Sequence, residues 1–450
     1  MYSQSTFFLR LWIFILILIA YYAFGLLQIA PFVSVCLFLF YCLTTGIVER
    51  CLFLIATVPL WQCNCPGFGI YISYVDILSL VVLVEGTLIA YKKIRDNKVN
   101  SNTMTILLLI VIIIAAILSS LIGIRSVITY GALARFIILA TTCAIISNVL
   151  FFAAVNDNEL GDRVLKVVAL QLIFFVIWYL CLWTIQPDRL TYGQYESIFA
   201  GNGRLLVSND LATFFCMSIP CMFAFDITKR FLGMVLIFSI YVVLLVATQS
   251  RGGLVVFVFF MFMFGIFQRS KKKFYFILLL IVCTPIAGYY GYDVFEQRFI
   301  DYQNEYRFDL IKTYFTIFFD HPVFGIGWGA WIHRGDLNYI SNQDIALNAI
   351  GTNAHNMYLS VMATGGIVFT LPFLTLFVHW LNALIRTGRN NTFTSKGIWI
   401  CNSQIALIGL LSILLYGLFA DMSNSPLFWI TISIIPTMTV CVRDKAIYIR

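Results

Sequence analysis

The sequence predicts an all-α polytopic integral membrane protein with about 12 to 14 transmembrane helices. Three observations lead to this prediction. Hydrophobic residues make up 61% of the chain and charged residues only 11%, whereas roughly a quarter of a soluble domain is charged. The apolar residues form long runs, most of them close to the ~20 residues that cross a bilayer. Basic residues gather in short clusters at the ends of those runs.

The apolar runs follow one another along the chain with short polar connections. The first is preceded by residues 1–10 without a small-residue cleavage site, so we expect a retained helix and not a signal peptide. The run at 51–61 is short and is a candidate for a re-entrant segment. The runs cover residues 11–27, 29–48, 51–61, 70–91, 104–121, 127–153, 164–185, 211–227, 231–248, 253–267, 274–290, 357–385, 398–420 and 427–442.

Basic clusters recur at every second boundary between these runs. Because cytoplasmic loops carry an excess of lysine and arginine, the clusters predict that both termini lie in the cytoplasm of a bacterium. The segments around Arg125, 186–210, 250–252, 292–356 and 421–425 are then expected on the outer side of the inner membrane. The chain divides into N-terminal helices (1–291), one large periplasmic loop (292–356) and C-terminal helices (357–450). The clusters are Lys92, Lys93, Arg95 and Lys98; Arg163 and Lys166; Lys229 and Arg230; Arg269, Lys271, Lys272 and Lys273; Arg386, Arg389 and Lys396; and Arg443, Lys445 and Arg450.

Charge and cysteine usage argue against several classes of protein. The formal net charge of +8 is distributed over helix ends, so it reports orientation and does not predict nucleic-acid binding. The cytoplasmic connections are too short for a nucleotide-binding domain, which disfavours an ATP-driven transporter. Most of the 12 cysteines lie in apolar runs and show no metal or disulfide spacing. Only Cys63 and Cys65 are candidates for a bridge.

The large outer loop is the predicted site of chemistry, because it holds three of the four histidines. His321 is followed by glycines at alternate positions, Gly325, Gly327 and Gly329, which permit close approach of backbone or ligand. A tight turn with structural glycines is one interpretation, and contact with substrate is the other. His355 and Asn356 stand where the loop re-enters the membrane, and an imidazole there is suited to proton transfer or to binding phosphate. The histidine spacing matches no metal site.

Arginines near the predicted outer face are candidate partners for an anionic ligand. Guanidinium groups offer fixed, bidentate donors to phosphate. Arg125, Arg204, Arg251 and Arg307 each stand in or beside an outer segment. For any one of them, a side chain that snorkels to the membrane surface is the alternative.

Several of these residues, taken in order, resemble the O-antigen ligase and polymerase superfamily, membrane glycosyltransferases that use undecaprenyl-diphosphate-linked sugars on the periplasmic face. The resemblance extends over about residues 248–372. Thr364 and Phe369 depart from the family pattern, and because both lie past the loop we expect them to affect helix packing. The matching residues are Thr248-Gln249-Ser250-Arg251-Gly252, Arg307, His321-Pro322, Gly325, Gly327, Gly329, His355-Asn356, Tyr358-Leu359 and Gly366.

The resemblance implies a glycosyltransferase of GT-C-like architecture that works by inversion, with no metal, no nucleotide and no other cofactor. Arg251 and Arg307 would hold the departing diphosphate, and His355 would activate the acceptor or orient that phosphate. His321, the three glycines, Asn356, Arg204 and Arg125 would contact the substrate. The implied partners are the lipid-linked oligosaccharide, an acceptor, the membrane lipid, and flippase and chain-length regulator proteins.

Three further questions remain open on the sequence. A polymerase, whose acceptor is a second lipid-linked glycan, is favoured over a ligase, whose acceptor is lipid A core, because the loop is moderate in size and lacks a large basic platform. A small-anion transporter would need charges near the bilayer midplane, and Arg135, Glu85 and His379 are the candidates. A scaffold that docks partners through the loop is the remaining alternative.

Overall fold

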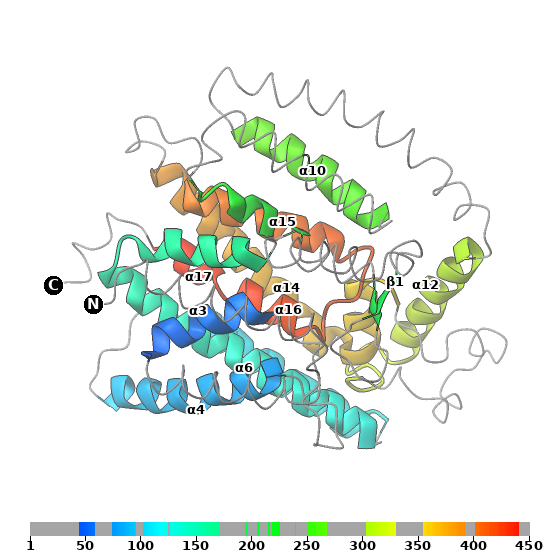
Figure 1. The fold of residues 1–450 in the computed structure, drawn as a ribbon. Coiled ribbons are helices and arrows are strands. Elements are labelled where there is room, and N and C mark those ends of the chain that lie inside the picture. Colours follow the sequence, from blue (N-terminus) through cyan, green and yellow to red (C-terminus); the bar gives the residue numbers. More distant parts are fainter. Residues whose placement is uncertain are drawn as a thin grey trace.

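The computed structural model shows a helical bundle with one short ribbon of two strands (Figure 1). Three described helices are long and apolar enough to cross a membrane. The predicted helical, polytopic fold class is therefore confirmed, whereas the count of about 12 to 14 helices rests partly on runs that lie outside the described residues. The structure describes residues 45–58, 74–95, 102–124, 127–171, 194–196, 205–207, 215–216, 218–225, 239, 251–267, 303–329, 354–391 and 401–440.

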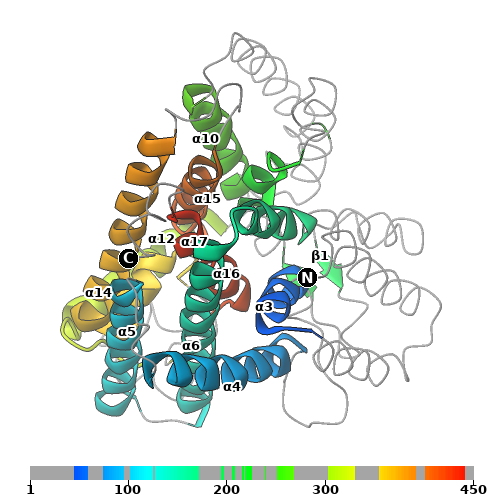
Figure 2. The same cartoon turned by 90° about the vertical axis from the view of Figure 1, so that its left-hand side faces the viewer.

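The centre of the bundle is built from α5 (Thr103–Ile122), α6 (Val127–Asn156) and α14 (Met357–Asn391). Figure 2 shows these helices side by side, with α5 in contact with both of the others. Each begins within one residue of a predicted apolar run, because a run of about 20 apolar residues is stable in a bilayer as a helix that satisfies its own backbone.

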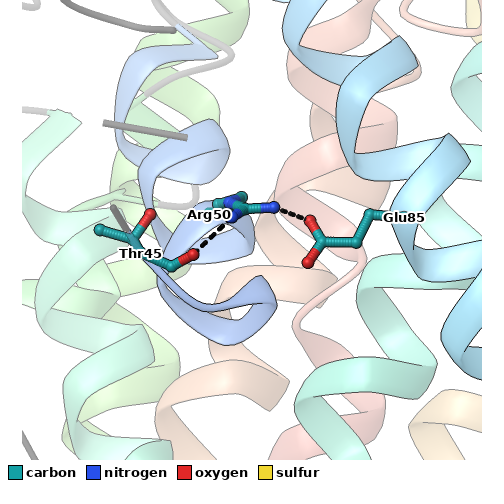
Figure 3. A network of polar contacts seen from close by, with 3 residues as sticks. All are labelled: Thr45, Arg50 and Glu85. Atoms are coloured by element: carbon teal, nitrogen blue, oxygen red, sulfur yellow. Dashed lines mark hydrogen bonds and ion pairs between the residues drawn. The ribbon is translucent and has the colours of Figure 1, made fainter. Parts of the chain in front are cut away.

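Two helices near the N-terminus are joined by an ion pair between charged side chains. Arg50 on α3 (Ile47–Thr57) pairs with Glu85 on α4 (Tyr74–Arg95) and also donates to the carbonyl of Thr45 at 2.5 Å (Figure 3). At 1.5 Å per residue, the 11 residues of α3 extend about 16 Å. This is too short to span a hydrocarbon core of about 30 Å, as the short run at 51–61 predicted.

The remaining described helices lie around this centre. α10 (Arg251–Phe267) packs on α15 (Asn402–Tyr416), and α12 (Gln303–Asp320) packs on α14. α12 lies within the predicted loop, 292–356, directly before the alternate glycines. The outer segment 186–210 contributes a pair of strands that the sequence did not predict, β1 (Gln194–Glu196) antiparallel to β2 (Leu205–Val207).

The last apolar run, 427–442, is helical but is interrupted at residues 433–434. The run is broken into α16 (Pro426–Ile432) and α17 (Ile435–Met438). Proline has no backbone N–H, so Pro436 cannot donate to the carbonyl of Ile432, four residues earlier. The Ser433 hydroxyl donates to the carbonyl of Ile430 at 2.6 Å and closes the end of α16.

α14 is longer than a membrane crossing and is kinked. Its 35 residues extend about 52 Å, whereas the hydrocarbon core needs about 20 residues. Counted back from Arg386, about 20 residues reach Gly366, where the backbone leaves the helical region (φ 60°, ψ −166°). With Arg386 at the predicted cytoplasmic edge, we expect the segment from Met357 to Gly365 to extend beyond the hydrocarbon, toward the predicted outer side. We call this end of the bundle the Met357 end.

Candidate functional site

The segment from His321 to Gly329, which we call the glycine turn, fills the kink of α14. At the kink, two carbonyls and two N–H groups of α14 lose the partners that a continuous helix would supply. The glycine turn satisfies all four, so these backbone groups stay paired across the break in the helix. The four bonds run from Ile326 N to Ala363 O (3.0 Å), from Gly327 N to Thr364 O (3.0 Å), from Ile367 N to Pro322 O (2.8 Å) and from Val368 N to Val323 O (3.1 Å).

Glycine is required here by close approach of two backbones. Gly325 and Gly366 both have positive φ, of 66° and 60°. A Cβ on Gly325 would lie 2.5 Å from the carbonyl of Thr364, and one on Gly366 would lie 2.3 Å from the carbonyl oxygen of Val323. The structure thus confirms the tight-turn interpretation of Gly325, Gly327 and Gly329. Their direct contact with substrate stays a prediction.

Trp328 fixes the glycine turn in the bundle. Its ring stacks on Phe369, with centroids 4.5 Å apart, and lies 4.4 Å from Phe136 of α6. Its indole Nε1 donates to the Oδ1 of Asn424 at 2.6 Å. The carbonyl of Thr364 accepts from the Ser119 hydroxyl at 2.6 Å. Phe369 thus packs in the core, and the Thr364 side chain is buried with its hydroxyl donating to the carbonyl of Ser360 at 2.7 Å.

His355 and Asn356 form the entry to α14. His355 is a non-glycine residue with positive φ (47°), a conformation that costs about 1–3 kcal/mol and needs support from its surroundings. The Oδ1 of Asn356 accepts from the N–H groups of Tyr358 and Leu359, both at 3.0 Å, which is N-capping geometry. The structure gives the Asn356 side chain a positioning role, and its contact with substrate stays a prediction.

The entry to α14 rests on the turn that follows α15, residues 416–419. Met357 N donates to the carbonyl of Gly417 at 2.7 Å, and Asn356 Nδ2 donates to the carbonyl of Leu418 at 3.2 Å. The 416–419 turn thereby supports the backbone that holds His355.

The start of α10 packs on the same turn. α10 begins at Arg251, and a Cβ on the next residue, Gly252, would lie 2.7 Å from the Cβ of Phe419 and 3.1 Å from Tyr416. The segments that carry Arg251 and His355 therefore both contact residues 416–419, although about 100 residues separate them in the sequence.

α12 places Arg307 at the same end of the bundle. One turn after Arg307, Leu310 begins a buried face that packs against the residues on either side of His355 and in α14. The helix that carries Arg307 is thus seated on the segment that carries His355, and in Figure 1 it lies at one end of the bundle. The cluster comprises Ile124, Leu310, Tyr314, Ile317, Ile326, Ala354, Leu359 and Ala363.

Asp421 is a candidate functional residue that sequence reasoning missed. It accepts from Ser423 N at 3.0 Å and from the Ser423 hydroxyl at 2.7 Å, and it is hydrogen-bonded to the side chain of Ser360 in the first turn of α14. Burial raises the pKa of the Asp421 carboxyl, and the hydrogen bonds from Ser360 and Ser423 partly offset this rise. The sequence could have indicated Asp421, because it is the only charged residue between 401 and 440.

The other predicted residues are placed as follows. His321 ends α12, donating from its N–H to Ile317 and accepting from Gly325 N at 3.0 Å. Arg125 and Arg204 lie outside the described residues, as do the side chains of Arg251 and Arg307. Among the side chains that the structure describes, no group of three or more His, Cys, Asp or Glu is arranged to hold a metal ion.

Comparison with known proteins supports the resemblance. A family model described as O-antigen ligase (Wzy_C) matches residues 234–374. The matched stretch contains α10, α12, the glycine turn and α14 as far as residue 374, and so includes Arg251, Arg307 and His355. Among proteins of curated function, none matches this chain.

Proposed function

We propose that this chain, whose residues 234–374 match the O-antigen ligase family model, polymerises undecaprenyl-diphosphate-linked oligosaccharide units. The reaction would take place on the periplasmic face of the bacterial inner membrane. The observation that carries the proposal is the convergence of the Arg251, Arg307 and His355 segments at the Met357 end. These segments come from three separate helices, and Arg251 and His355 share the 416–419 turn as a support.

The proposed reaction is an inverting displacement at the anomeric carbon of the donor sugar. An acceptor hydroxyl oxygen forms the new bond to that carbon and loses its proton. The bond from the carbon to the lipid diphosphate breaks, and the diphosphate leaves with the electron pair. Charge develops on the leaving diphosphate, so positive groups fixed near it lower the barrier. Arg251 and Arg307 are proposed for this role, and His355 for activating the acceptor or orienting the phosphate.

The first turn of α14 positions His355, but its backbone N–H groups are already hydrogen-bonded and do not serve as donors to a ligand. The N–H of Met357 bonds to Gly417, and those of Tyr358 and Leu359 bond to the Asn356 side chain. A phosphate at this helix start would find those amides already paired, in contrast to the usual anion site at a helix N-terminus. This supports arginine side chains as the diphosphate ligands.

Asp421 is proposed as a positioning residue for His355. It holds Ser360 by a hydrogen bond, and Ser360 N in turn donates to the carbonyl of Asn356 at 3.0 Å. The carboxyl is thus linked to the capping residue beside His355. A shift of the first turn of α14 would move the imidazole, and small misplacements of reacting groups are costly in catalysis.

A ligase that transfers the glycan to lipid A core is the second candidate function. The description of the matching family as O-antigen ligase favours it, whereas the moderate loop without a large basic platform favours the polymerase. Transport is disfavoured, because Glu85, one of the few candidate charges within the apolar helices, is paired with Arg50. A flippase and a chain-length regulator are proposed partners of the polymerase.

The glycan profile of a deletion strain tests the proposal. Lipopolysaccharide is separated on a gel, and lipid-linked polymer is assayed in parallel. Core that carries a single repeat unit, with no ladder, is the result expected for the polymerase. Bare core with polymer accumulating on the undecaprenyl carrier would instead identify a ligase, and an unchanged profile would contradict both functions in lipopolysaccharide synthesis.

A further inference from the structure

α12 has two apolar faces, although only one of them packs on the protein. The buried face carries Leu310, Tyr314 and Ile317. The other carries Phe315 and Phe319, which are 40% and 70% exposed and whose rings stack with centroids 6.4 Å apart. Residues four apart lie on the same side of a helix, so these two rings form a continuous exposed stripe.

This stripe continues onto the membrane-crossing part of α14. Val323, just after α12, is 51% exposed, and its carbonyl accepts from Val368 N of α14 at 3.1 Å. The neighbouring Ile367 and Leu371 are 44% and 59% exposed. Farther along α14, Leu374 and Val378 continue the same exposed apolar face. An exposed apolar face on a helix that crosses a bilayer is covered by lipid.

The depth of the stripe in the membrane is inferred from the part of α14 that crosses the bilayer. Gly366 lies where the span of about 20 residues reaches its outer edge, and Ile367 is the next residue. Exposed charged residues bound the two rings along α12: Lys312 lies one turn before Phe315 on the same face, and Asp320 follows Phe319. A helix with an apolar stripe between charged residues, at the edge of the hydrocarbon, is suited to lie in the membrane interface.

We propose that α12 is an interfacial helix, with Phe315, Phe319 and Val323 inserted among the acyl chains of the lipid leaflet at the Met357 end. The partner of the stripe is the bilayer itself, because the stripe is continuous with the lipid-facing surface of α14. Arg307 is eight residues, or about 12 Å of helix, from Phe315. Seating α12 in the interface holds this arginine near the headgroups, where the diphosphate of a lipid-linked donor lies. Only this last consequence rests on the proposed function.

Cysteine labelling in intact cells tests the proposal without reference to activity. Phe319→Cys and Asp320→Cys are matched, because both residues are exposed neighbours on α12. Each variant is treated with a membrane-impermeant maleimide, and labelling of the unsubstituted chain, which has 12 cysteines, is subtracted. A thiol among acyl chains does not form the reactive thiolate. We expect Phe319→Cys to be labelled severalfold less than Asp320→Cys.

Equal labelling of the two variants would overturn the proposal, because the stripe would then face water. Photo-crosslinking from p-benzoylphenylalanine at position 319 separates lipid from protein as the cover. Adducts to lipid alone support the interface, and an adduct to a second protein chain would overturn it. Both readouts are independent of glycan synthesis, so they remain informative if the proposed reaction is wrong.

Discussion

The substitution Gly366→Ala tests how the glycine turn and α14 are joined. Gly366 has φ 60° and ψ −166°, a region that is essentially restricted to glycine and costs other residues about 1–3 kcal/mol. The new Cβ would lie 2.3 Å from the carbonyl oxygen of Val323 and 2.6 Å from Gly325 N. These are backbone atoms, so no side-chain rotation relieves the clash.

If the clash pushed α14 away from the glycine turn, the hydrogen bonds between them would be lost. The bonds from Ile367 N to Pro322 and from Val368 N to Val323 contribute about 0.5–1.5 kcal/mol each. Together with the conformational term, the expected loss for Gly366→Ala is about 3 kcal/mol or more. The contacts by which Trp328 fixes the glycine turn in the bundle would also be disturbed, so glycan synthesis should fall together with stability.

Thermal unfolding in mild detergent, followed by fluorescence-detected size-exclusion chromatography, measures the effect. Gly265→Ala on α10 is the matched control, because nothing lies within 4 Å of the position that its new Cβ would take and alanine is favoured over glycine in a helix by about 1 kcal/mol. We expect Gly366→Ala to melt well below the wild type and Gly265→Ala at or above it. Equal melting of the two variants would refute the backbone contact.

Three further predictions follow from individual contacts. Trp328→Phe keeps the ring stack but removes the 2.6 Å hydrogen bond to Asn424, so we expect a loss of about 1 kcal/mol or more in a denaturation assay; no loss would mean that the bond is absent. The raised pKa of Asp421 makes its ionised form costly at neutral pH, and this cost disappears as pH falls through that pKa. The melting temperature of the wild type should therefore rise relative to Asp421→Asn on acidification, and a constant difference would contradict the shift. Glu85→Met leaves the Arg50 charge without its partner and should cost about 3 kcal/mol. The double replacement of both residues by methionine should be more stable than this single one, and the opposite order would argue against the pair.

Much of the fold was predictable, because the sequence records how each segment partitions into lipid. α5 and α6 begin within one residue of their predicted runs. The tight turn was one of two interpretations of the alternate glycines, and it is their positive φ values in the structure that support it.

Contacts between distant segments were not predictable. The kink at Gly366 does not change the hydropathy of the run, so the sequence pattern does not indicate it. The backbone groups that lose their partners at the kink are hydrogen-bonded by the glycine turn, about 40 residues earlier. Asp421 meets Ser360, and Arg50 meets Glu85, only through the rotation and packing of separate helices. An apolar pattern specifies which residues avoid water, but it does not specify which polar residues face each other.

The predicted site has features of both kinds, some predictable from the sequence and some set by tertiary packing. The position of His355 at the entry to α14 followed from the end of the loop and the start of an apolar run. Its unusual backbone conformation, and the support of Arg251 and His355 by one turn after α15, depend on tertiary packing. The sequence therefore identified candidate residues, and the structure shows how the segments that carry Arg251 and His355 are supported.

The most direct test of the proposed chemistry is the release of undecaprenyl diphosphate by the purified protein in lipid nanodiscs. The donor is the lipid-linked oligosaccharide extracted from the deletion strain, and glycan length is measured in the same samples. We predict that the wild type releases undecaprenyl diphosphate in step with glycan extension, that Arg307→Ala and His355→Ala abolish both, and that the control Lys312→Ala retains both. Release and extension that persist in Arg307→Ala and His355→Ala would contradict the assignment of the site.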